Sequence, residues 1–151
     1  MAFGVFIQPA VPFSSFKAAL VITGGKHPAF FLDASFGLGA SSSGINPPAQ
    51  PVTLEVGTYA VTIPAGSFRL LNPGQKLAIY EFNGTISGAS LILDITSLGH
   101  NSYQFGVAGT PVNLITVPNP VSVSLSIGNN AGSTSVNAKR IPGTAATAGA
   151  Q

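Results

Sequence analysis

The sequence has no cysteine, no tryptophan and few charged residues, which make up 7% of its 151 positions. An ordinary soluble domain has about 25% charged residues. The absence of cysteine excludes a disulfide framework, thiol catalysis and cysteine-based zinc sites. Six Lys and Arg against four Asp and Glu leave a net charge of +2, so we expect no nucleic-acid partner.

Long apolar runs and helical periodicity are also missing. No run approaches the roughly 18 apolar residues of a transmembrane helix, so we expect no membrane span. No segment keeps an apolar stripe at helical spacing over several turns, which excludes a coiled coil. The chain has instead 18 Gly and 12 Pro, residues that supply the backbone angles of tight turns. This composition favours many short strands joined by turns.

Apolar and polar residues alternate in nine short runs, and turn-forming residues separate these runs. The pattern predicts an all-β fold in which two antiparallel sheets pack face to face and bury every second residue. We therefore expect a two-layer antiparallel β-sandwich of about nine strands. The alternative is a partly closed β-barrel, which shows the same alternation. The expected strands are 16–23, 29–38, 52–56, 59–63, 77–82, 91–95, 103–107, 121–127 and 133–138.

One face of these runs should form a single hydrophobic core. Its expected members lie at the alternating apolar positions or at their equivalents in the other half of the chain. They are Leu20, Ile22, Phe30, Leu32, Leu54, Ile79, Leu93, Tyr103, Phe105, Val123 and Leu125.

The two halves of the chain resemble each other at an offset of 73 residues. Segment 17–22 then aligns with 90–95, and segment 51–57 resembles 120–128. An internal duplication would produce such matches, and so would chance similarity between amphipathic strands, so both interpretations stay open. If the duplication is real, we expect it to describe two similar sheets.

By composition, the chain divides into an N-terminal extension 1–12, a β-sandwich domain 13–140 and a C-terminal tail 141–151 of small uncharged residues. The extension alternates like a β-strand over residues 2–7. Such a strand can leave its own domain and complete the sheet edge of another chain. The residues expected to make this assembly contact are Phe3, Val5, Phe6 and Ile7.

The four carboxylates are Asp33, Glu55, Glu81 and Asp94, and each lies in a predicted strand between apolar neighbours. That is the position of a residue on the solvent face, so we expect no catalytic residues and no enzyme activity. Strands remote in sequence can still bring two carboxylates together. Glu55 and Glu81 are the first pair to check, since each lies near a candidate surface tyrosine.

Two histidines, His27 and His100, lie in predicted turns and have no carboxylate or thiolate beside them. Two imidazoles alone make a poor metal site. The run Gly128–Gly132 has the look of a calcium loop, but it offers amides where calcium prefers anionic oxygens. We interpret it as a hairpin turn, and we expect neither a metal nor a cofactor.

A family resemblance rests on four strings of the sequence: Pro51–Gly57, Thr62–Phe68, Tyr80–Gly84 and Asn119–Gly128. They resemble a family of uncharacterised, exported bacterial β-rich proteins without known activity. The resemblance covers about residues 13–138 and implies an extracellular β protein. The turn after the last string is acidic in that family but Asn129-Asn130 here, which weakens any metal-binding analogy.

These observations favour an extracellular or cell-surface structural subunit that self-assembles as a homo-oligomer or polymer, such as a fibre, filament or surface layer. Low charge gives a monomer little electrostatic protection against association. The alternative is a secreted carbohydrate- or surface-binding module, with Tyr59, Tyr80 and Tyr103 as the possible face for a polysaccharide. An enzyme and a viral shell or tail component are weaker alternatives.

Overall fold

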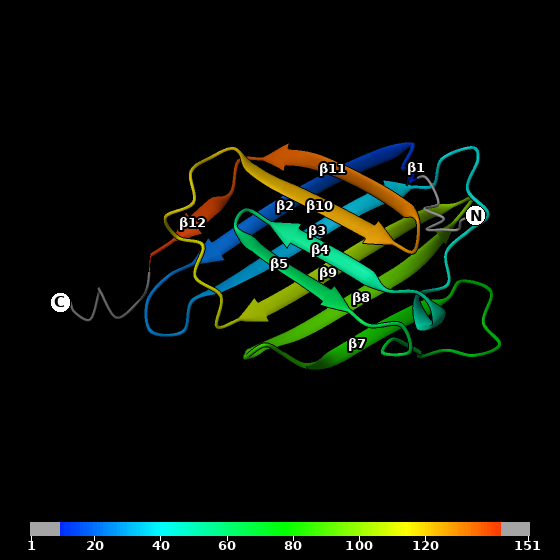
Figure 1. Cartoon of the computed structure of the whole chain (residues 1–151), viewed down its shortest axis with the longest axis horizontal. Helices are drawn as coiled ribbons and strands as arrows, with labels where there is room; N and C mark the ends of the chain where they lie inside the picture. Colours follow the sequence, from blue (N-terminus) through cyan, green and yellow to red (C-terminus); the bar gives the residue numbers. More distant parts are fainter. Residues whose placement is uncertain (1–9, 143–151) are drawn as a thin grey trace, which may run out of the picture.

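Two β-sheets, of five and seven strands, pack face to face in the computed structural model, which describes residues 10–142 (Figure 1). The predicted all-β sandwich is confirmed, and the described residues close no barrel. The five-stranded sheet has the order β1 (Val11–Pro12), β11 (Asn130–Val136), β10 (Val121–Ile127), β4 (Val52–Val56), β5 (Tyr59–Ile63). The seven-stranded sheet has the order β12 (Lys139–Ile141), β2 (Ser15–Thr23), β3 (Ala29–Gly37), β9 (Ser102–Thr110), β8 (Ala89–Gly99), β7 (Ile79–Ile86), β6 (Arg69–Leu70).

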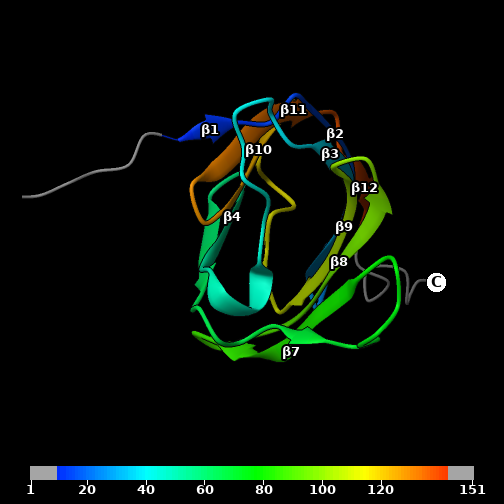
Figure 2. The same cartoon turned by 90° about the vertical axis from the view of Figure 1, so that its right-hand side faces the viewer.

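All nine predicted strands are present, because alternation at period two is a strong local signal. The structure adds the short strands β1, β6 and β12, and a single 3-10 turn at Pro47–Ala49. The sandwich thus extends to Val11 at one end and to Ile141 at the other. β1 and β12 are both parallel to their neighbours, β11 and β2. Figure 2 shows β1, β11 and β2 together along one side of the sandwich, with β7 on the opposite side.

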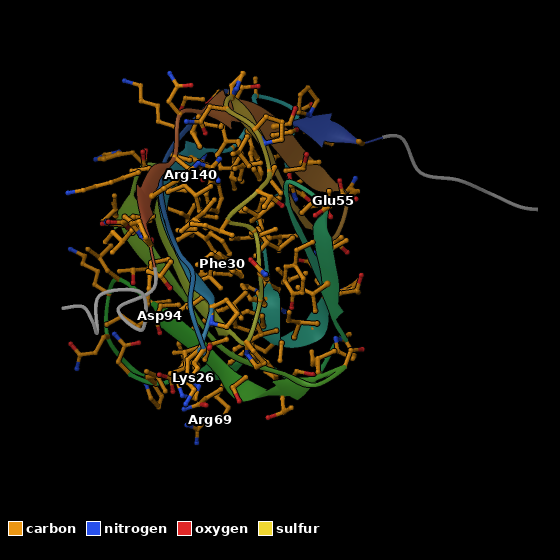
Figure 3. All side chains as sticks on the ribbon, turned by 90° about the vertical axis from the view of Figure 1, so that its left-hand side faces the viewer. Lys26, Phe30, Glu55, Arg69, Asp94 and Arg140 are labelled. Atoms are coloured by element: carbon orange, nitrogen blue, oxygen red, sulfur yellow. The ribbon has the colours of Figure 1, made fainter. Side chains whose placement is uncertain are left out.

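The core lies between the two sheets, and nine of the eleven predicted core residues are buried in it. Figure 3 shows Phe30, which has no exposed surface, in this position. The two exceptions are half-buried. Tyr103 packs against the core with its ring stacked on that of Phe36. The prediction that Ile79 lies in the core is wrong: it pairs with Thr96 on the outer face of β7, whereas Tyr80 and Phe82 pack inward.

The topology has a two-fold pseudosymmetry. β3 lies beside β9 in one sheet, flanked by β2 and β8, and β4 lies beside β10 in the other, flanked by β5 and β11. Asp33 pairs with Gly106 within the β3–β9 contact, and these positions are separated by the sequence offset of 73. An internal duplication would produce this arrangement. The expectation that the duplication describes two similar sheets is wrong, because the matching hairpins share one sheet.

Candidate functional site

β5 is an unpartnered edge of the five-stranded sheet. Among the described residues it pairs with β4 alone. The other edge strands are shorter: β1 and β6 have two residues each, β12 has three, and β5 has five. Natural proteins protect such edges with lysine, proline or bulges. β5 reads Tyr-Ala-Val-Thr-Ile, with none of these.

The backbone of β5 offers hydrogen-bonding groups to solvent at two positions. Val56 and Tyr59 flank a two-residue turn and pair with each other, as the first and last residues of a hydrogen-bonded β-turn do. Bonded and non-bonded pairs alternate along an antiparallel ladder. The N–H and C=O groups of Ala60 and Thr62 therefore point away from β4, and both residues are exposed.

The side chains of β5 follow the same alternation. Val61 and Ile63 are buried in the core, and Tyr59 packs on Phe30 with ring centroids 5.6 Å apart. The Tyr59 hydroxyl is buried with no hydrogen-bond partner among the described residues, and burial raises the pKa of this tyrosine. β5 therefore places both unpaired backbone groups and the margin of the hydrophobic core at the edge of the sandwich.

The outer face of the five-stranded sheet is a hydroxyl-rich surface. An open hollow of about 530 Å³ lies over β4, β10 and β11, and Glu55 contributes the carboxylate in its lining. Thr53 and Thr62 bond to each other across β4 and β5 at 3.0 Å. The hydroxyl-bearing residues of this face are Thr53, Thr62, Ser122, Ser124, Ser126, Ser133 and Ser135.

Three of the four carboxylates lie in one row across the outer face of the seven-stranded sheet. Asp33 and Asp94 both pair with Gly106, and Asp94 pairs in turn with Glu81. Glu81 contacts Arg69 at 3.5 Å. Partial burial, with a further contribution from Glu81, raises the pKa of Asp94. The row therefore brings two acidic groups together, although nothing encloses them.

The carboxylate pair singled out from the sequence is not formed. Glu55 lies on the outer face of β4 and Glu81 on the outer face of β7, so the core separates them. Figure 3 shows Glu55 and Asp94 on opposite sides of the molecule. Sequence reasoning missed the Glu81–Asp94 pair because the tight Ser87-Gly88 turn between β7 and β8 was not recognised. The Ser-Gly dipeptide was the available signal.

The outer face of the seven-stranded sheet also carries an apolar row. Val21, Phe31, Ala108 and Ile92 pair in sequence across β2, β3, β9 and β8. Phe31 is 48% exposed and Ile92 is 44% exposed. A small hollow of about 150 Å³, almost entirely apolar, lies between these two side chains. The row is therefore an exposed apolar strip on this face of the sheet.

The three candidate ligand-binding tyrosines do not form one exposed face. Tyr59 belongs to the five-stranded sheet and the other two belong to the seven-stranded sheet. All three are half-buried against the core. Tyr80 lies near Tyr103, and burial, with a contribution from Tyr80, raises the pKa of Tyr103. These tyrosines support the core more than they offer a stacking platform.

The histidines and the glycine-rich turn lie apart from these surfaces. His27 lies between β2 and β3, and His100 lies between β8 and β9 at the other end of the sheet. Gly128 and Asn129 form the two-residue turn of a hairpin. Asn130 is buried and bonded to Ser42 at 2.6 Å. Within residues 10–142, no three His, Asp or Glu side chains gather as a metal site would require.

The predicted assembly residues Phe3, Val5, Phe6 and Ile7 lie outside the described residues. Within the described part of the chain, no helix has the length and apolar character needed to cross a membrane. Comparison of the chain with protein-family models, with curated proteins and with solved structures gave no match. The resemblance to exported bacterial β-rich proteins therefore stays a prediction.

Proposed function

We propose that this protein is an extracellular structural subunit that self-assembles through β-strand contacts into a fibre, filament or surface layer. The observation that carries the proposal is the free edge β5, which is uncharged and has no partner in the described chain. An added strand there would satisfy the outward N–H and C=O groups of Ala60 and Thr62. It would also cover the margin of the core at Val61 and Ile63.

The low charge of the chain supports the same function. Net charge is +2, and most outward positions on the five-stranded sheet carry hydroxyl groups. Electrostatic repulsion between copies is therefore weak, which favours close association. The exposed row with Phe31 and Ile92 provides a second surface on which strands of subunits can pack side by side.

A lysine on the free edge tests this function. Ala60→Lys places a charge beside the outward backbone groups of β5, the device by which natural edges resist pairing. Gln104→Lys is the matched control, because Gln104 is also exposed but lies on β9 in the interior of the other sheet, outside the row with Phe31 and Ile92. We expect light scattering and negative-stain images to show assemblies for wild type and Gln104→Lys, and monomers for Ala60→Lys. Wild type that remains monomeric at every concentration would refute the function.

The second candidate function is a secreted module that binds carbohydrate or another surface. The hydroxyl-lined hollow with Glu55 favours it, because hydroxyl and carboxylate groups are suitable partners for sugar hydroxyls. Pull-down with insoluble polysaccharides, comparing wild type with Glu55→Gln and Ser124→Ala, tests this candidate. We expect both variants to weaken binding if the hollow is the binding site.

A further inference from the structure

We propose that the strand added to β5 consists of residues 2–7 of a second copy of this chain, so that subunits join head to tail. This inference rests on the proposed self-assembly and names the partner of the same edge. It follows from the complementarity of the two segments and from the distance between them within one subunit.

The two segments match in length and pattern. Residues 2–7 read Ala-Phe-Gly-Val-Phe-Ile and, like β5, contain no charge and no proline. With Phe3, Val5 and Ile7 turned inward, their side chains would extend the core next to Val61 and Ile63 of the acceptor. Ala2, Gly4 and Phe6 would then lie outward, on the face where β5 carries Ala60 and Thr62.

A subunit cannot complete its own edge in this way. β1 and β5 are the two opposite edges of the five-stranded sheet. A strand beyond β5 would lie five strand spacings from β1, or about 24 Å. Ile7 is four residues from Val11 in β1, and four residues span at most about 14 Å. The donated strand must therefore pair with another molecule.

The same geometry determines the form of the assembly. β1, which follows the donor segment in the sequence, lies at one sheet edge and the acceptor β5 lies at the opposite edge, so the contact would be heterologous. Heterologous contacts propagate into rings or open helical filaments, depending on the rotation between subunits. The contact therefore allows an open chain of subunits or a closed ring, of which reciprocal exchange between two copies is the smallest.

Two one-sided variants test the head-to-tail contact. Deletion of residues 1–9 removes the donor but keeps Val11, which pairs with Asn130. Ala60→Lys blocks the acceptor but keeps the donor. Each variant alone should be monomeric, and a mixture of the two should form a 1:1 heterodimer and nothing larger. Circular dichroism establishes that both variants are folded.

Because the chain has no cysteine, an engineered pair reports on one contact only. Two cysteine pairs test the two outward positions of β5. One combines Gly4→Cys with Ala60→Cys, and the other combines Gly4→Cys with Thr62→Cys. Under oxidation we expect a ladder of covalent multimers that collapses to one monomer band on reduction. Gly4→Cys with Gln104→Cys is the control and should give no ladder.

The outcomes separate this inference from the proposed function. Assemblies that persist after deletion of residues 1–9, or that form no ladder with either β5 pair, refute donation by residues 2–7 and leave self-assembly through β5 standing. Monomers for wild type at all concentrations refute both.

Discussion

The guanidinium of Arg140 donates a hydrogen bond to the side-chain oxygen of Asn119 at 3.0 Å, joining β12 to the loop between β9 and β10. The same guanidinium donates to the carbonyls of Leu114, Ile115 and Val117. Asn119 in turn accepts a bond from the backbone of Ala138 at 3.0 Å. One inward-facing cation thus satisfies three backbone carbonyls of this loop.

Replacement of Arg140 should therefore destabilise the sandwich. Arg140→Ala leaves several partly buried acceptors without a donor, and we expect a loss of about 3 kcal/mol in the free energy of unfolding. Lys139→Ala is the matched control, since Lys139 is the adjacent exposed cation on the outer face. Urea unfolding of both variants measures the difference. Equal stability of the two would show that the Arg140 bonds contribute nothing.

Two glycines of β9 should differ in how much stability they lose on replacement by alanine. A Cβ at Gly109 would lie 2.6 Å from the ring of Phe30 and 3.0 Å from Leu91, both in the core, whereas a Cβ at Gly106 meets nothing within 4 Å. Gly109→Ala should cost about 1–3 kcal/mol through overpacking. Gly106→Ala should change stability by less than about 0.5 kcal/mol. Thermal unfolding of the two variants and wild type measures these changes in stability. Similar losses of stability for both variants would contradict the prediction.

The sequence was most informative where one local pattern determines the structure. Alternation at period two identified all nine long strands and most of the core. It failed at β7, where the inward Tyr80 and Phe82 alternate with the apolar Ile79, and where Leu77, just before the strand, continues the pattern of Ile79. Alternation alone cannot choose between two apolar faces, and only the pairing with β8 decides it.

The strand order, and with it the candidate site, could not be read from the sequence. β1, β6 and β12 have only two or three residues, too few to show a period. That β5 is a free edge depends on which strands pair at a distance, since β4 uses its other side for β10. The carboxylate row of Asp33, Asp94 and Glu81 is likewise a product of register between distant strands.

The raised pKa of Asp94 predicts a pH-dependent effect of its removal. Burial, and then Glu81, raise this pKa, so the folded state binds the Asp94 proton more tightly than the unfolded state. Above its folded pKa such a group is ionised in both states and destabilises the fold. Below its unfolded pKa of about 4 it is protonated in both states and contributes nothing to the stability. Asp94→Asn should therefore be more stable than wild type at pH 7, and this gain should vanish near pH 3.

Chemical unfolding of Asp94→Asn and wild type at the two pH values measures this difference. Glu55→Gln is the control for loss of a carboxylate, because its cross-strand neighbours are Ser124 and Ala60 instead of another acid. A gain for Asp94→Asn that is the same at pH 3 and pH 7 would show that ionisation of Asp94 is not its cause.

The Glu81–Asp94 pair is the one arrangement in the described chain that resembles catalytic chemistry. Directly opposed residues of antiparallel strands have Cβ atoms about 4.5–5.5 Å apart, and retaining glycosidases hold their two carboxyl groups about 5–5.5 Å apart. A raised pKa on one carboxyl group is also typical of a general acid. These two features make hydrolysis the specific enzyme hypothesis to test.

We predict that the pair hydrolyses nothing. Neither Glu81 nor Asp94 lines the hollow at Asp33 or the hollow at Phe31. Glu81 also forms an ion pair with Arg69 at 3.5 Å. Catalysis needs an enclosed site that positions the substrate and excludes water, which an open sheet face does not provide. Reducing-sugar assays on a panel of soluble polysaccharides should therefore give background rates for wild type, Glu81→Gln and Asp94→Asn alike. Sugar release by wild type that is lost in Glu81→Gln and retained in Glu55→Gln would establish a glycosidase and overturn the structural function.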